Sequence, residues 1–129
     1  MKEFESPAGA ICWEEIPEGI AANGVIPRDA EYFQDHFPAF PVLPGVLGLE
    51  ILKRILEDYL LGKTESSAGS RWRLARLEDV RFSAYLRPGD EWEARLVCVG
   101  QEKERVCWKG RLSSYGKTAT QAQLFLNRE

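Results

Sequence analysis

The sequence predicts an α+β fold in which a curved antiparallel sheet wraps round one long helix. From about Pro44 or Gly45 to Leu61, apolar residues recur on most sides of a helical cylinder. From Arg71 onward, apolar and polar residues alternate, which is typical of antiparallel strands with one buried face. Because a helix and a sheet bury their apolar surfaces against each other, the two patterns together favour an α+β architecture.

The segment before the helix combines short strands with a long loop. Strand-like pieces around 11–13 and 20–26 are separated by glycines and prolines. Residues 28–45 are typical of an ordered loop, whose prolines recur every third residue, the period of polyproline II. This period indicates a stiff segment leading into the helix.

The helix has only a narrow polar stripe, so we expect most of its surface to be covered by the rest of the protein. Gly62 is placed to end the helix in a left-handed conformation, and residues 63–70 are typical of a flexible surface loop. The polar stripe consists of Glu50, Lys53, Arg54, Glu57 and Asp58.

Four strands joined by short turns are expected after this loop, and no repeat or linker divides the chain, which favours one domain over 1–129. The expected strands are 71–87, 91–99, 104–112 and 117–126, and the expected turns are 88–90, 100–103 and 114–117. The residues expected to face the core are Trp92, Ala94, Leu96, Cys98, Val106, Trp108, Leu112, Thr120, Ala122, Leu124 and Leu126. Trp13 and Trp72 are expected in the core or at an interface.

Composition excludes several classes of protein. The chain has 129 residues, 44% hydrophobic and 29% charged, as in an ordinary soluble domain. It has no apolar run long enough for a membrane span and begins without a signal-peptide core, so we expect a cytoplasmic protein. Three cysteines without CxxC spacing and a single histidine argue against a disulfide scaffold and against a metal site. No glycine-rich nucleotide-binding loop is present.

The charge is unevenly distributed. A net charge of −3 argues against nucleic-acid binding by the chain as a whole. Residues 66–88 nevertheless concentrate arginines, which indicates docking of an acidic partner. The alternative is that these arginines only solvate one face of a strand. The arginines are Arg71, Arg73, Arg76, Arg81 and Arg87.

One short segment contains the parts needed for proton transfer beside a carbonyl. His36 is the only histidine, and its ordinary pKa lets it exchange protons near neutral pH. Gly45 lies where the helix begins, and its backbone N–H can be approached by a ligand oxygen. Glu50 follows within the helix as a candidate acid. Each also has a purely structural explanation: a packed histidine, a helix start, and a surface carboxylate paired with Arg54.

Residues 36–50 read HFPAFPVLPGVLGLE, which resembles without gaps the signature of the bacterial β-hydroxyacyl-acyl carrier protein dehydratases, enzymes with the hot-dog fold. The spacing of fourteen residues between His36 and Glu50 is retained. A looser likeness continues through 80–82 and 87–90. The glutamate at the acid position is similar to that of the branch that dehydrates without isomerising.

The resemblance implies a cofactor-free enzyme that acts as a homodimer, in some members assembled further into a trimer of dimers. It implies an active site at the dimer interface, where His36 of one subunit is the base and Glu50 of the other is the acid, with the Gly45 N–H bound to the substrate carbonyl. Phe37, Val46 and Phe82 are the implied substrate contacts. The substrate is implied to arrive on an acidic acyl carrier protein, for which the arginines of 66–88 are docking candidates.

Two departures from the signature indicate a divergent member. Ala39 replaces a usual glycine. Arg54 stands where the family usually has a glutamine that contacts the acid, and an arginine there would stabilise the ionised form of Glu50 and oppose its role as a proton donor. Two alternatives stay open: a hot-dog acyl thioesterase in which Glu50 activates water, and a non-catalytic subunit that binds the acyl carrier.

Overall fold

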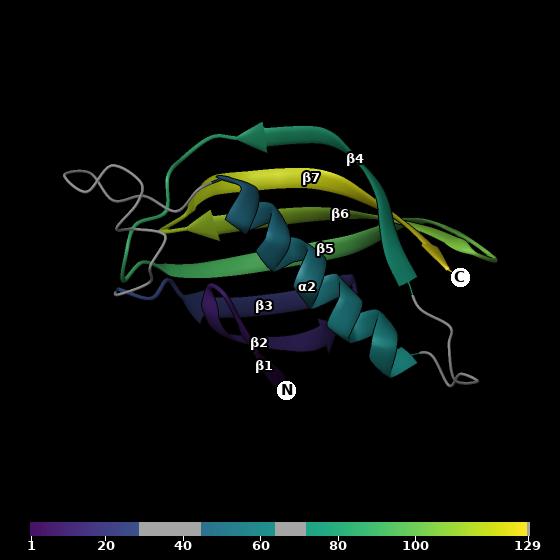
Figure 1. The fold of residues 1–129 in the computed structure, drawn as a ribbon, viewed down its shortest axis with the longest axis horizontal. Coiled ribbons are helices and arrows are strands. Elements are labelled where there is room, and N and C mark those ends of the chain that lie inside the picture. The colour runs from purple at the N-terminus through teal and green to yellow at the C-terminus, as the bar shows by residue number, and fades with distance from the viewer. Residues whose placement is uncertain (29–44, 64–71, 129) are drawn as a thin grey trace.

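The computed structural model describes residues 1–28, 45–63 and 72–128. Within these residues, seven strands form one antiparallel sheet in the order β1-β2-β3-β5-β6-β7-β4, and helix α2 packs on one face of it (Figure 1). The predicted α+β architecture is therefore confirmed. The elements are β1 (Lys2–Ser6), β2 (Gly9–Ile16), β3 (Gly19–Val25), α2 (Gly45–Lys63), β4 (Trp72–Phe82), β5 (Glu91–Glu102), β6 (Arg105–Ser114) and β7 (Lys117–Arg128).

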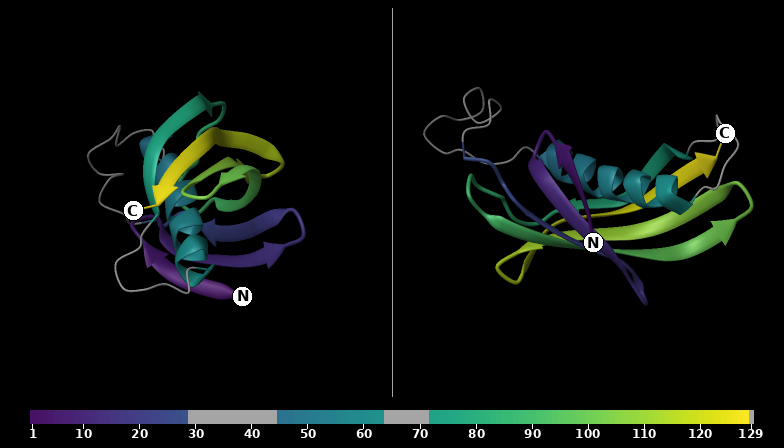
Figure 2. Two further views of the ribbon diagram at one scale, coloured as in Figure 1. Left: turned by 90° about the vertical axis from the view of Figure 1, so that its right-hand side faces the viewer. Right: turned by 90° about the horizontal axis from the view of Figure 1, so that it is seen from below.

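The sheet curves round α2, which lies on its concave side (Figure 2). One face of the helix is fully buried against the inward residues of the sheet. Gly110 leaves room for the Leu52 side chain, whose Cδ atoms lie 3.3 Å from the position that a Cβ of residue 110 would occupy. The buried helix residues are Ile51, Leu52, Ile55, Leu56 and Leu60, and the sheet contributes Ile11, Ile20, Trp92, Leu96, Trp108, Leu112, Leu124 and Leu126. Among the described residues, no helix is long and apolar enough to cross a membrane.

The expected coverage of the helix is confirmed between residues 47 and 60, which are all buried or half-buried. The exposed residues lie at the two ends, where Val46 and Leu61 are 68% and 67% exposed. The predicted stop at Gly62 is wrong, because the helix runs on to Lys63. Gly62 has no neighbour within 4 Å, so nothing there demands a left-handed turn.

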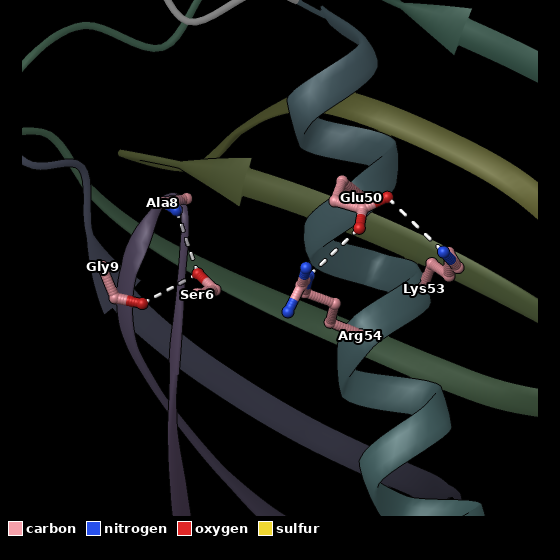
Figure 3. Close-up of polar contacts among 6 residues, drawn as sticks. All are labelled: Ser6, Ala8, Gly9, Glu50, Lys53 and Arg54. Carbon is pink, nitrogen blue, oxygen red and sulfur yellow. Dashed lines mark hydrogen bonds and ion pairs between the residues drawn. The ribbon is translucent and has the colours of Figure 1, made fainter. Parts of the chain in front are cut away.

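Strand β1 is an addition to the sequence prediction. It pairs with β2 through a tight turn in which the Ser6 hydroxyl accepts from the Ala8 N–H at 3.0 Å and donates to the Gly9 carbonyl at 2.8 Å (Figure 3). Gly9 has φ of 91°, which favours glycine. The predicted 11–13 and 20–26 pieces are the cores of β2 and β3.

The alternating pattern locates β5, β6 and β7 correctly, and the expected inward residues are buried except Cys98. Cys98 is exposed although it pairs with Trp108, and a bulge shifts the register just after it, between Cys98 and Gly100. The strands continue past this bulge, so the β5–β6 turn lies at 103–104 rather than 100–103. The β6–β7 turn falls where expected, with Tyr115 and Gly116 at φ of 50° and 78°.

Strand β4 is shorter than predicted, ending at Phe82 rather than continuing to residue 87. Its register with β7 shifts between Glu78 and Arg81, where Asp79 has φ of 51°. After Phe82 the chain leaves the ladder, although the Ser83 N–H still donates to the Ala119 carbonyl at 2.8 Å. The predicted turn at 88–90 is confirmed, with Gly89 at φ of 85°. The predicted loop 28–45 lies almost wholly outside the described residues.

Candidate active site

The N-terminus of α2 opens onto a cavity of about 340 Å³. Three helix residues form one side, and the end of β4, the following loop and β7 form the other. Most of the lining is apolar, and Thr120 of β7 supplies a hydroxyl group. The lining residues are Gly45, Val46, Gly48, Phe82, Ala84, Tyr85, Leu86 and Thr120.

Two glycines let this end of the helix approach its neighbours closely. A Cβ at Gly45 would stand 2.8 Å from Cε1 of the Phe82 ring, and one at Gly48 would stand 2.7 Å from Oγ1 of Thr120. Any side chain at Gly45 would therefore displace the Phe82 ring from the cavity wall. The first N–H groups of a helix have no partner within it, and the helix dipole favours negative charge there. The Gly45 end of the cavity is thus suited to a substrate carbonyl that gains negative charge.

The Glu50 carboxylate is held between two cations on the same helix (Figure 3). Its Oε1 accepts from Nε of Arg54 at 3.0 Å, and its Oε2 lies 3.8 Å from Nζ of Lys53. The Glu50 side chain is 33% exposed in the single chain. Both contacts stabilise the ionised carboxylate. The sequence left open where Arg54 points, and it points to Glu50.

Glu50 does not line the cavity at Gly45. Because an α-helix turns by about 100° per residue, Glu50, five residues after Gly45, lies on a different side of the helix from Gly45. The single chain therefore brings Gly45, Val46 and Phe82 together and keeps Glu50 apart from them. His36 and Phe37 lie outside the described residues. Gly48 and Thr120 were not among the predicted site residues, although Thr120 was expected to face the core; an isolated glycine inside a helical pattern was the available signal for Gly48.

Three of the arginines predicted to dock a partner lie along β4, opposite Asn127, Phe125 and Gln121 of β7, which alternate with the buried residues of that strand. Arg76 lies over the Phe125 ring, 4.1 Å from its centre, with its Nε 2.6 Å from Glu78. Arg87 lies beyond β4, where its backbone N–H donates to Oδ2 of Asp90 at 2.9 Å. Arg73 and Arg81 lie on β4, and Arg71 is outside the described residues.

The cysteine in the middle of the sheet is a poor nucleophile. Burial, together with Cys98 and Glu78 nearby, raises the pKa of the Cys107 thiol. A reactive cysteine requires the opposite, a thiolate stabilised at neutral pH. Cys107 is therefore not a candidate nucleophile.

Most of the chain matches a known protein family. The family described as ApeI-like, ApeI dehydratase, matches residues 14–121. The chain belongs to this dehydratase family. The match spans strands β2 to β7 and the helix, so it includes both the cavity at Gly45 and the Glu50 position.

Curated relatives carry the name 3-hydroxyacyl-[acyl-carrier-protein] dehydratase FabZ. The protein from Halalkalibacterium halodurans is 29% identical over 113 residues, which cover 86% of this chain and 80% of the relative. That from Acinetobacter baylyi is 30% identical over 75% of this chain and 67% of its own length. That from Bacillus cereus is 37% identical over 60% of this chain and 54% of its own length. The predicted family is confirmed by these similarities.

Solved structures of thioesterases show the same fold. The Haemophilus influenzae thioesterase HI1161 superposes with a TM-score of 0.66 at 18% identity, covering 92% of this chain and 78% of that one. The fluoroacetyl-CoA thioesterase FlK superposes with a TM-score of 0.69 at 12% identity, covering 84% of this chain and 83% of that one. The predicted hot-dog fold is therefore confirmed.

Proposed function

We propose that this chain removes water from a 3-hydroxyacyl thioester, carried by acyl carrier protein, to give the trans-2-enoyl thioester. The observation that carries the proposal is the cavity at the start of α2, where Gly45 lies against Phe82 without a side chain to block its backbone. Membership of a dehydratase family supports the same reaction. We expect the protein to act in the cytoplasm and without a cofactor.

The reaction needs a base, an oxyanion site and an acid. His36 takes the proton from the carbon next to the carbonyl, and the electrons move onto the thioester oxygen, which the helix N-terminus at Gly45 stabilises. The bond to the 3-hydroxyl then breaks as Glu50 donates a proton to it, and water leaves. The proton held by His36 returns to Glu50 through solvent, which restores the starting state.

The active unit is a homodimer in this proposal. The separation of Glu50 from the cavity at Gly45 supports a site shared between two copies, in which one chain supplies the base and the other the acid. Exposed apolar residues surround the cavity: Val46, Phe82 and Tyr85 are 68%, 56% and 72% exposed. Among the described strands, β4 pairs only with β7, so its other edge is available for a second copy.

The test is the reverse reaction, followed by loss of enoyl absorbance with trans-2-enoyl thioesters on carrier protein and on coenzyme A. We expect the wild type to hydrate them, and His36→Ala and Glu50→Gln to lower the rate by at least about a hundredfold. Glu57→Gln is the matched control, because Glu57 lies two turns further along the same polar stripe. Unchanged hydration by His36→Ala would refute the assignment.

A thioesterase is the second candidate, and the ion pairs of Glu50 favour it. A carboxylate held by Arg54 at 3.0 Å and Lys53 at 3.8 Å is better suited to activating water than to donating a proton. Release of free thiol without an enoyl intermediate, dependent on Glu50, would select this function. Carrier binding without either reaction would select a non-catalytic subunit.

A further inference from the structure

The cavity at the start of α2 has an exposed mouth and a buried floor. The floor lies where the first turns of the helix pass over β7 (Figure 1). The mouth residues are Gly45, Val46, Phe82 and Tyr85, the floor residues are Gly48, Leu86 and Thr120, and Ala84 is half-buried between them. A chain that enters beside Gly45 therefore runs inward towards β7.

Thr120 places a hydroxyl group on this floor. The residue is only 4% exposed, and none of the described residues forms a hydrogen bond with its side chain. Among the described residues, the fully buried side-chain atoms without a partner are the indole nitrogens of Trp92 and Trp108. Oγ1 of Thr120, which also has no partner, therefore keeps accessible surface, and this surface faces the cavity that Thr120 lines.

Gly48 keeps this hydroxyl open to the cavity. Oγ1 is the Thr120 atom nearest to the position of a Cβ on residue 48, at 2.7 Å, whereas Cβ and Cγ2 lie at 3.4 and 3.6 Å. Any side chain on residue 48 would therefore cover the hydroxyl. Glycine is unfavourable inside a helix, so α2 carries an unfavourable residue at a place where a side chain would close off Oγ1.

A hydroxyl group on a buried floor needs a partner once a ligand has displaced the water from it. A fully reduced acyl chain would displace that water and offer no hydrogen bond in return. An oxygen on the chain would supply the missing partner. Sites that form a hydrogen bond with a substrate oxygen discriminate strongly against the analogue that lacks it. The Thr120 hydroxyl therefore favours an oxygenated chain.

The helix sets how far along the chain this oxygen lies. Three residues separate Gly45 from Gly48, which corresponds to a rise of about 4.5 Å along the helix. An extended, zigzag acyl chain covers this length in about four carbon–carbon bonds of about 1.5 Å each. Counted from a thioester carbonyl carbon, C1, at Gly45, the carbon nearest to Thr120 is C5.

We propose that Thr120 is a specificity-determining residue, whose hydroxyl selects acyl chains that carry an oxygen on C5. The inference rests on the proposed function, which places the thioester carbonyl at Gly45. A threonine hydroxyl both donates and accepts hydrogen bonds, so it suits a hydroxyl or a carbonyl group on the chain. Extension of a 3-oxygenated acyl chain by two carbons moves its oxygen to C5. A chain-extension reaction that leaves this oxygen in place would therefore supply the substrate.

The test compares two pantetheine thioesters of nearly equal shape, 5-hydroxyhex-2-enoyl and 5-methylhex-2-enoyl, by initial rates of loss of enoyl absorbance. Each enantiomer of the hydroxy compound is assayed separately. We expect the wild type to hydrate the better enantiomer with a kcat/KM at least about tenfold above that of the methyl compound. Thr120→Val removes the hydroxyl at nearly constant shape and is expected to abolish or reverse this preference. Thr120→Ser keeps a hydroxyl and is expected to retain it.

Thr118→Val is the matched control for the change from threonine to valine. Thr118 lies on the same strand and is not among the described residues that line the cavity, so we expect the wild-type preference in this variant. Equal kcat/KM values for the two thioesters in the wild type would overturn the inference, because they would show that water satisfies the hydroxyl. A preference that survives in Thr120→Val would overturn it as well.

Failure of the proposed function is distinguishable from failure of this inference. If the wild type hydrates neither thioester, calorimetry gives the dissociation constants of amide analogues of the two saturated chains, in which NH replaces the thioester sulfur. Tighter binding of the 5-hydroxy amide by the wild type, lost in Thr120→Val, supports the inference while the dehydratase assignment fails. Equal binding of the two amides by the wild type, or no binding of either, overturns the inference itself.

Discussion

Arg54 is the residue at which this chain departs most from the signature that it resembles. Its Nε donates to Glu50 at 3.0 Å, and an ion pair of this spacing on a helix surface contributes about 0.5 kcal/mol. That energy corresponds to a factor of about two in rate if it opposes protonation of the acid. We therefore expect Arg54→Gln to raise kcat for enoyl hydration about twofold, measured as initial rates at saturating substrate.

Lys53→Gln is the control for the loss of one positive charge. Lys53 lies 3.8 Å from Glu50, so we expect Lys53→Gln to raise kcat by less than Arg54→Gln does. A decrease in kcat with Arg54→Gln would contradict the prediction. It would show that the guanidinium orients the carboxylate and that this orientation outweighs the electrostatic effect.

Gly48 offers a second test at the residue scale. Replacing glycine with alanine inside a helix ordinarily stabilises it by about 1 kcal/mol. Here the new Cβ would stand 2.7 Å from Oγ1 of Thr120, and overpacking costs about 1–3 kcal/mol. We expect Gly48→Ala to lower the free energy of unfolding in urea by up to about 2 kcal/mol. In a Thr120→Ala background we expect Gly48→Ala to raise the free energy of unfolding instead. If the effects of the two substitutions on this free energy simply add, the contact between residues 48 and 120 is contradicted.

The site illustrates which residues a sequence can reveal. The Glu50–Arg54 pair follows from spacing along one helix, and the structure places Val46 and Phe82 beside Gly45 in one cavity. The Gly48–Thr120 contact joins the helix to β7, across more than seventy residues of sequence. No local pattern encodes such a contact, because it depends on how the helix docks on the sheet.

At the scale of elements, a clamp fastens α2 to the first strands. The Trp13 indole donates to Oδ2 of Asp58 at 2.7 Å, and the Tyr59 hydroxyl donates to Oε2 of Glu15 at 2.8 Å. The Tyr59 ring meets Trp13 and Trp108 edge-on, with ring centres 5.7 Å and 5.4 Å apart. The clamp links the helix C-terminal half to both β2 and β6.

Asp58 tests one side of this clamp. Trp13 is only 8% exposed, so removing its acceptor leaves a buried N–H without a partner. We expect Asp58→Ala to lower the free energy of unfolding by about 1–3 kcal/mol, measured in urea. Glu57→Ala, the adjacent acid, is the control and is expected to change stability by less than about 0.5 kcal/mol. Equal effects from the two variants would argue against the clamp.

Tyr59 tests the other side through pH. Burial, with the hydrogen bond to Glu15, raises the pKa of Tyr59 from 10.0 to about 12. A raised pKa in the folded state means that the hydroxyl contributes its full stability below pH 10.0 and loses it as the pH rises towards 12. We expect Tyr59→Phe to be less stable than the wild type at pH 8 and to approach it by about pH 12. If the difference in unfolding free energy between Tyr59→Phe and the wild type stays constant from pH 8 to about pH 12, the raised pKa of Tyr59 does not contribute to stability.

Element boundaries show where sequence patterns fail. Alternation located β5, β6 and β7 because each has one face buried under the helix. The end of β4 was misplaced because its ladder with β7 ends at Phe82, and this depends on pairing with β7 rather than on residue type. Strand β1 has few apolar residues, so only its pairing with β2 identifies it.

At the scale of the whole molecule, two surfaces are not covered by any of the described residues, and the proposed second copy would cover them. One is the free edge of β4, and the other is the apolar rim of the cavity at Gly45. Burial between copies would also strengthen the Glu50–Arg54 interaction, because screening by water falls.

The proposed dimer is tested most directly at Val80, which is 37% exposed on the free-edge strand β4. A lysine there places an unpaired charge in the interface and blocks strand addition. We expect the wild type to sediment at twice the chain mass of 14.6 kDa and Val80→Lys to sediment at that mass. Val99→Lys is the matched control, because Val99 is 54% exposed on β5, away from this edge. If the site is shared between copies, Val80→Lys loses hydration activity together with the dimer; an active monomer would place the whole reaction within one chain.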